Sequence, residues 1–152
     1  MQLRDLASFL MGIFLSALAG CAGSSAPPSA GQATAENFQF NAHLTNGLVL
    51  SGHLPDESAK DSLMNLAASI FPDAQIVNEM ITDGISVSGW HRTTRWGLSS
   101  LSKLEEGRLV IIDHTLLLEG RAANAAIKSR VEAATIGLKA EIGYSVVINI
   151  AE

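Results

Sequence analysis

The stretch Leu48-Val49-Leu50-Ser51-Gly52 recurs later in the chain as Leu116-Leu117-Leu118-Glu119-Gly120. The same offset places Asp56 on Asn124, and both residue types favour the N-cap of a helix, because the side-chain oxygen accepts a hydrogen bond from the first turn. Behind each cap, apolar positions recur at the spacing of one face of an amphipathic helix. The chain is therefore predicted to contain one structural unit twice. The paired apolar positions are Ala59 and Ile127, Leu63 and Val131, Leu66 and Ala134, and Ile70 and Leu138.

Each copy is predicted to open with a β-hairpin. In the first copy the turn falls at Asn46-Gly47, a pair that accommodates the positive φ angles of a type I′ turn. In the second copy the turn lies near His114. A third strand with alternating apolar positions follows each predicted helix. The predicted strands are residues 38–44, 48–52 and 75–81 in the first copy, and residues 108–113, 115–120 and 144–150 in the second.

An additional helix is predicted in front of the second copy, over residues 94–106. Leu98, Leu101 and Leu104 lie along one side of it, and Gly107 is a residue type that commonly ends a helix. We therefore predict an α+β fold with two ββαβ units, the second with an extra leading helix, packed as a pseudo-symmetric pair. The predicted sheets are small and mixed, and helices are expected to cover one face of them. Such sheets leave edge strands that can pair with another protein or with a second copy, which makes a homo-oligomer a further expectation.

Two segments of the first copy carry a resemblance to a known family. They are Leu-Ser-Gly-His-Leu-Pro-Asp at 50–56 and Ile-Val-Asn-Glu-Met-Ile at 76–81. They resemble the BON family, named for bacterial osmotic-shock and nodulation proteins. The resemblance extends over residues 38–150 and is weaker in the second copy, where Arg121-Ala122-Ala123-Asn124 replaces the Pro-Asp opening. It implies two modules that contact phospholipid surfaces and support envelope integrity.

The amino-terminal region resembles a bacterial lipoprotein signal. An apolar run begins at Leu6 and closes in Leu18-Ala19-Gly20-Cys21, where Cys21 is the only cysteine of the chain. The run is shorter than the roughly 20 apolar residues that cross a bilayer. The resemblance implies cleavage before Cys21 and acylation of its thiol; the alternative is an uncleaved short anchor with a free thiol. Ala22 in place of an aspartate favours the outer membrane, on its periplasmic face.

Several acyl chains hold a protein firmly at a membrane, since each buried methylene contributes about 0.8 kcal/mol. The following residues, 22–35, contain no large apolar side chain and are predicted to form a flexible tether. The predicted organisation is a signal peptide at 1–20, the lipidated Cys21 with its tether at 21–35, a first BON-like module at 36–83, a linker at 84–93 and a second BON-like module at 94–152.

Charge and motif content argue against several function classes. The net charge of −5 disfavours nucleic acid, which needs a clustered basic surface. The four histidines, His43, His53, His91 and His114, have no ligand spacing, so no metal or other cofactor is predicted. His53 lies near Asp56 and is expected to form a local hydrogen bond with it. Since no nucleophile motif or phosphate-binding loop is present, we predict no catalytic residues and no enzyme activity.

One cluster stands out, from Trp90 to Trp96. It holds both tryptophans of the chain together with Arg92 and Arg95. Tryptophan and arginine are enriched at binding hot spots and at membrane interfaces, which makes these four residues the candidate binding site for lipid headgroups or a protein partner. The alternative is that the two indole rings pin the linker and the following helix to the core.

The sequence thus predicts a non-enzymatic outer-membrane lipoprotein whose BON-like modules bind phospholipid surfaces or envelope components. A structural role in an envelope or secretion assembly is the alternative.

Overall fold

The computed structural model describes residues 37–152, with the backbone alone over residues 136–142. The predicted signal peptide, Cys21 and the tether lie outside the described residues. The elements are β1 (Gln39–Leu44), β2 (Leu48–His53), α1 (Glu57–Ile70), β3 (Ile76–Ile81), α2 (Trp90–Leu101), β4 (Glu106–Ile112), β5 (Thr115–Arg121), α3 (Ala125–Ile142) and β6 (Ser145–Ala151). The predicted order, ββαβ twice with a helix between the copies, is confirmed.

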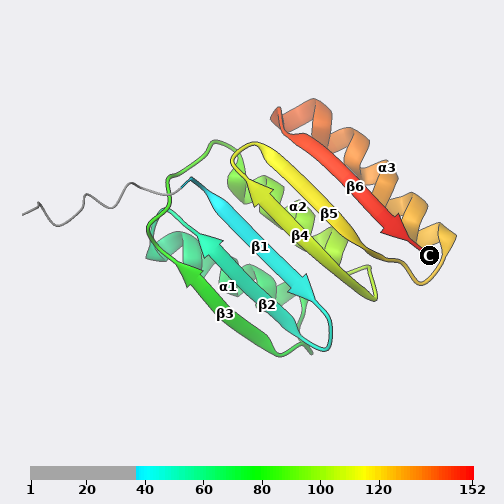
Figure 1. The fold of residues 1–152 in the computed structure, drawn as a ribbon, viewed down its shortest axis with the longest axis horizontal. Coiled ribbons are helices and arrows are strands. Elements are labelled where there is room, and N and C mark those ends of the chain that lie inside the picture. Colours follow the sequence, from blue (N-terminus) through cyan, green and yellow to red (C-terminus); the bar gives the residue numbers. More distant parts are fainter. Residues whose placement is uncertain (1–36) are drawn as a thin grey trace, which may run out of the picture. The chain divides into compact units, whose positions relative to one another are not determined.

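The two units share one sheet. Its strand order is β3-β2-β1-β4-β5-β6, so the first strands of the two units, β1 and β4, pair in the middle (Figure 1). β1 pairs antiparallel with both β2 and β4, and β2 pairs parallel with β3. β5 pairs in the same two ways, antiparallel with β4 and parallel with β6. The two small sheets expected from the sequence are therefore joined edge to edge.

The register reveals a pseudo-twofold relation between the units. Leu44 pairs with Leu48 in the first hairpin as Ile111 pairs with Leu116 in the second, so β1 matches β4 and β2 matches β5. The second hairpin has one more residue between these paired positions than the first. The offset in residue number between β1 and β4 is therefore one residue smaller than that between β2 and β5. Ala42 lies two residues before Leu44, so its equivalent in β4 is Leu109, two residues before Ile111. These two equivalent residues pair with each other. The pseudo-twofold axis therefore passes between these two residues.

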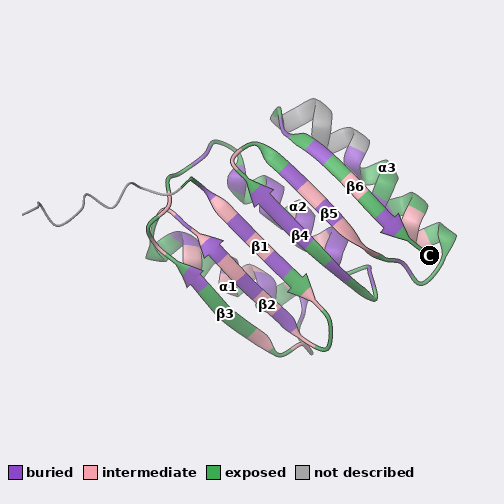
Figure 2. Cartoon of the chain, viewed as in Figure 1, coloured by how far each residue is buried: buried purple, intermediate pink, exposed green. Residues whose placement is uncertain are grey.

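All three helices lie on one face of the sheet (Figure 1). Burial alternates along β1, β2 and most of β5, so one set of side chains is buried beneath the helices while the other set faces away from them (Figure 2). α2 packs on the central strands and lies between α1 and α3. The largest fully buried side chains of this core are Phe38, Phe40, Leu48, Leu50, Leu54, Leu63, Leu98, Leu101, Leu109, Ile111, Leu116 and Leu118.

The predicted caps open α1 and α3. The carboxylate of Asp56 accepts a hydrogen bond from the backbone N–H of Ala59 at 2.8 Å, and the amide oxygen of Asn124 accepts one from Ile127 at 3.0 Å. The predicted apolar face of α1 is confirmed, with Ala59 and Leu63 buried. In α3, Val131 is buried as predicted.

One position of the predicted α3 face is wrong. Ala134 is exposed, and Thr135 is buried in its place. The hydroxyl of Thr135 donates to the carbonyl oxygen of Val131, so its burial leaves no unpaired polar group.

The helix between the copies differs from its prediction at both ends. It spans Trp90–Leu101 rather than residues 94–106, and Gly107 lies inside β4 instead of ending a helix. The chain leaves the helix after Leu101 because the N–H of Glu105 already donates to the carbonyl oxygen of Arg121, as part of the β4–β5 ladder. Tertiary strand pairing therefore overrides the helical spacing of the leucines.

Candidate functional site

The two tryptophans of the predicted cluster pack inward. Trp90 is 6% exposed, and its ring lies 5.3 Å from that of Phe38, at an interplanar angle of 39°. Trp96 is half-buried and packs against the same core. The indoles therefore hold the start of α2 against the sheet.

The two arginines of the cluster face the other way. Arg92 and Arg95 are exposed and, being three residues apart on α2, lie on one side of the helix. With His91 they line a groove of about 490 Å³ against α1, whose lining residues are Ser62, Leu63 and Leu66. We call this feature the α1–α2 groove. The ring of His91 stacks on Trp90 at 3.5 Å, which fixes one wall of the groove to the core.

The groove combines cationic walls with a partly apolar floor. Guanidinium groups bind phosphate and carboxylate oxygens through paired, charge-assisted hydrogen bonds. Leu66, which is half-buried, adds apolar surface beside them, and Leu63 is buried at its base. Such a groove suits an anionic group that carries an apolar part.

The first turn of α2 is held by contacts from distant parts of the chain. Gly89 takes the N-cap position with φ 80° and provides no side-chain cap. The hydroxyl of Tyr144, directly before the last strand, donates to the carbonyl oxygen of Ser88 at 3.2 Å. The hydroxyl of Thr93 donates to the carbonyl oxygen of Gly89. These contacts explain why the local sequence places the start of this helix four residues too late.

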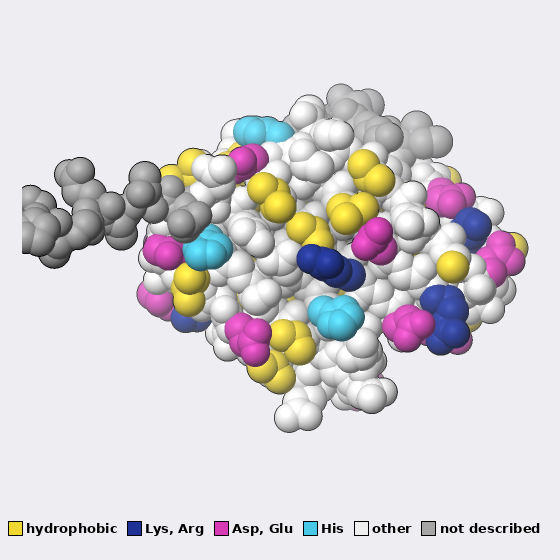
Figure 3. All heavy atoms as spheres, in the orientation of Figure 1, with side chains coloured by type: hydrophobic (Ala, Val, Ile, Leu, Met, Phe, Trp, Pro, Cys, Tyr) yellow, Lys and Arg dark blue, Asp and Glu magenta, His cyan; other side chains and the backbone are white. Residues whose placement is uncertain are grey.

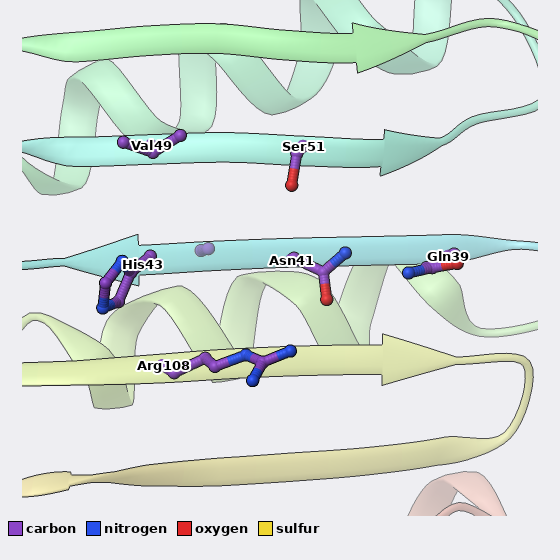
Figure 4. A pocket seen from close by; sticks show the side chains of 7 residues that line it. Gln39, Asn41, His43, Val49, Ser51 and Arg108 are labelled. Atoms are coloured by element: carbon purple, nitrogen blue, oxygen red, sulfur yellow. The ribbon is translucent and has the colours of Figure 1, made fainter.

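A second concave surface lies on the open face of the sheet, the side away from the helices. Figure 3 shows this face, where isolated charges are interspersed with hydrophobic patches. A depression of about 470 Å³ lies over β1, between β2 and β4 (Figure 4). We call it the β1 depression; its lining residues are Gln39, Asn41, Ala42, His43, Val49, Ser51 and Arg108. Apart from His43, which was considered among the histidines, the sequence did not single these residues out, because only the pairing of β1 with β4 brings them together.

Residues 43–89 match the family model of the BON-like domain. This stretch of the chain is therefore similar to the BON-like domain. The match confirms the resemblance seen in the first copy. No curated protein matches the chain.

The matched residues 43–89 contribute α1 to the α1–α2 groove and end at Gly89, the N-cap of α2. Domains of this family are non-catalytic binding modules of periplasmic or membrane-associated proteins, and they bind phospholipid membranes in general. No helix in residues 37–152 is long and apolar enough to cross a membrane.

The histidines lie apart from one another around the BON-like domain and its neighbouring unit. The Asp83 carboxylate accepts a hydrogen bond from His53 Nδ1 at 2.7 Å; the partner is not Asp56, as the sequence suggested, because the Asp56 carboxylate is used to cap α1. His114 lies beside the ring of Tyr144 at 5.2 Å. Among the described residues, no three His, Cys, Asp or Glu side chains are grouped as metal ligands.

Proposed function

We propose that the chain is a lipid-anchored, non-catalytic binding protein of the outer membrane, and that its BON-like domain contacts phospholipid headgroups through the α1–α2 groove. The observation that carries this proposal is the position of Arg92 and Arg95, directly beyond the matched residues and facing α1 of the domain. Acylated Cys21 would keep this groove near a bilayer surface.

The charge balance favours a local contact over adhesion of the whole surface. A chain with a net charge of −5 gains nothing from a general attraction to anionic lipids. Two guanidinium groups in one groove still bind a single phosphate, since phosphate offers several acceptor oxygens to their planar donors. The half-buried Leu66 provides a place for the apolar part next to the headgroup.

Vesicle flotation tests this proposal. The protein used is residues 34–152, which include every described element and lack the anchor that would itself insert. We expect it to float with vesicles of phosphatidylethanolamine and phosphatidylglycerol. The double variant Arg92→Gln and Arg95→Gln should bind about tenfold more weakly or worse, since each surface arginine contributes about 1 kcal/mol at an anionic membrane.

The matched control is Lys103→Gln with Arg130→Gln, which removes the same charge away from the groove. Both side chains are exposed, Lys103 just after α2 and Arg130 on α3. The control pair should float like the unaltered protein. Equal losses in the two double variants would assign binding to general charge, and an unaltered protein that ignores the vesicles would refute the proposal.

A second candidate role, as a structural part of an envelope assembly, is favoured by the two ends of the sheet. β3 and β6 each have only one neighbouring strand, and they expose Val77, Ile81 and Val147. Unpaired strand edges are templates for strand addition. Sedimentation velocity on residues 34–152 would show a concentration-dependent rise to the mass of two chains if such edges pair, and a constant single-chain mass would argue against self-association.

A further inference from the structure

We propose that the β1 depression is a binding site for the free carboxyl terminus of a short peptide. Arg108 would bind the carboxylate, and Asn41 would accept a hydrogen bond from the adjoining peptide N–H. The site does not rest on the phospholipid proposal, because it lies on the open face of the sheet and the α1–α2 groove lies on the helical side.

The depression exists because short side chains occupy its centre. Ser51 and Asn41 are opposite each other on β2 and β1, and the longer side chains of His43 and Arg108 are opposite each other in the next pair along β1 and β4. Its volume of about 470 Å³ lies within the range of about 300–1,000 Å³ that small-ligand sites occupy. Figure 4 shows the Ser51 hydroxyl turned toward β1 and the Arg108 side chain extended along β4.

Asn41 provides the first pointer to a ligand. Its Oδ1 atom is buried and accepts no hydrogen bond from the described residues. A buried acceptor without a partner is costly, and most such groups in folded proteins are paired. A rotation of the Asn41 side chain would expose this oxygen to a peptide N–H in the depression, while the Ser51 hydroxyl and Gln39 amide offer further polar partners.

Arg108 provides the charge that selects the ligand. It is the only lysine or arginine that lines the depression, and it makes no ion pair within the described residues, although Glu119 is opposite it on β5. The planar guanidinium matches a carboxylate with two parallel hydrogen bonds.

The acidic side chains beside the depression favour a single carboxylate as the ligand over a phosphate or an anionic bilayer. Glu79 is opposite Ser51 on β3, so carboxylates stand on both sides of the depression along the open face. They would repel a doubly charged phosphate or a densely anionic surface more strongly than a single carboxylate.

The site requires both units of the fold. β1 and β2 come from the first unit and Arg108 from the second, beside the pseudo-twofold axis. Asn41 and Arg108 are equivalent positions of the two copies, since they directly precede the equivalent residues Ala42 and Leu109. The first unit thus supplies the amide of Asn41 and the second unit supplies the cation of Arg108, on the two strands that join the units. Neither unit alone could form the site.

Titration by NMR tests the proposal. The protein is the full chain with Cys21→Ser, labelled with nitrogen-15 and held in a non-ionic detergent. The probes are N-acetyl-alanyl-alanine with a free carboxyl group, its carboxyl-terminal amide, and inorganic phosphate. We expect the free acid to shift the Asn41 side-chain amide and Ser51 backbone signals saturably, and the amide probe to bind about tenfold more weakly or worse, since it loses the charge-assisted contact.

Variants distinguish binding in the β1 depression from a general effect of surface charge. Arg108→Gln should weaken binding of the acid about as much as amidation of the probe does, and Arg130→Gln on α3 should leave it unchanged. Asn41→Ala keeps all charges and should still weaken binding by about threefold or more, since the buried acceptor is removed. The spectra themselves show whether each variant is folded. Equal binding of acid and amide, unchanged binding in Arg108→Gln, or saturable shifts with phosphate alone would overturn the proposal.

Discussion

At Gly52 and Gly120 the return strand of each unit leaves no room for a side chain beside the strand before it. Gly52 has φ 138°, a conformation that side chains rarely adopt, and a Cβ atom there would overlap the carbonyl oxygen of Gln39. A Cβ atom on Gly120 would overlap the carbonyl oxygen of Glu106 in the same way. This close approach explains why the repeated stretch ends in glycine in both copies.

Gly52→Ala should therefore destabilise the protein by about 3 kcal/mol or more, because backbone strain and a backbone clash add together. Gly143→Ala is the matched control: φ is 66° at that helix end, but nothing lies within 4 Å of the added Cβ, so only about 1 kcal/mol is expected. Urea unfolding of both variants measures the difference. Equal midpoints would show that the close approach at Gly52 has no energetic weight.

The buried position of Trp90 predicts a separation between stability and binding. Trp90→Ala should lower the free energy of unfolding by about 3–5 kcal/mol, as expected for a large ring removed from a core. Arg95→Gln should change it by less than about 1 kcal/mol, since the side chain is exposed. Thermal melting checks both. A Trp90 variant that melts normally while losing vesicle binding would make the indole a contact group instead.

Tyr144 predicts a loss of stability at alkaline pH. Burial raises the pKa of its phenol above the ordinary value of 10.0, Asp113 adds to this, and the hydrogen bond with Thr93 opposes it. The folded state thus favours the neutral phenol, so this stabilisation is complete below pH 10 and is lost as the pH rises from 10 through the folded pKa.

Absorbance at 295 nm measures this titration directly, because Tyr144 is the only tyrosine of the chain. The phenolate midpoint should lie above pH 10 in the folded protein and near 10 in concentrated urea. Tyr144→Phe should remove the tyrosine's part of the alkaline destabilisation. Identical midpoints in the two states would contradict the burial of this group.

Among the helices and strands, the sequence predicted correctly those features that depend on contacts between residues close together in the chain. The caps Asp56 and Asn124 were recognisable because each acts on a backbone N–H only three residues away. The start of α2 was not, since Gly89 offers no side chain and the anchoring comes from the distant Tyr144. The same limit applies to the predicted cluster: residue types alone left open whether the indoles contact a ligand or pin the helix to the core, and only the packing of Trp90 on Phe38 shows that this ring is buried.

The two caps should contribute similarly to stability. Asp56→Ala and Asn124→Ala should each cost about 1 kcal/mol, because each leaves an N–H of the first turn unpaired. Asp56→Asn keeps an acceptor in place and should cost only a small part of this. Chemical denaturation of the three variants checks the prediction. A loss with Asp56→Asn as large as with alanine would assign the effect to charge and not to capping.

At the scale of the whole molecule, the repeat predicted the two units but not their union. Each ββαβ order follows from turns and periodicities within one unit, whereas the pairing of β1 with β4 joins strands that have β2, α1, β3 and α2 between them in the chain. The β1 depression arises only from that pairing, so no local pattern could indicate Asn41 and Arg108 as neighbours. The α1–α2 groove could be predicted in part, since Arg92 and Arg95 were already singled out.

The joining of the two units through β1 and β4 is the claim on which both proposed sites depend, and interstrand NOEs test it most directly. In the full chain with Cys21→Ser, protons of Ala42 should show NOEs to Leu109, and those of Phe40 to Ile111, together with slow amide exchange along β1. NOEs confined to the hairpins β1–β2 and β4–β5, with β1 and β4 exchanging as edge strands, would contradict the account.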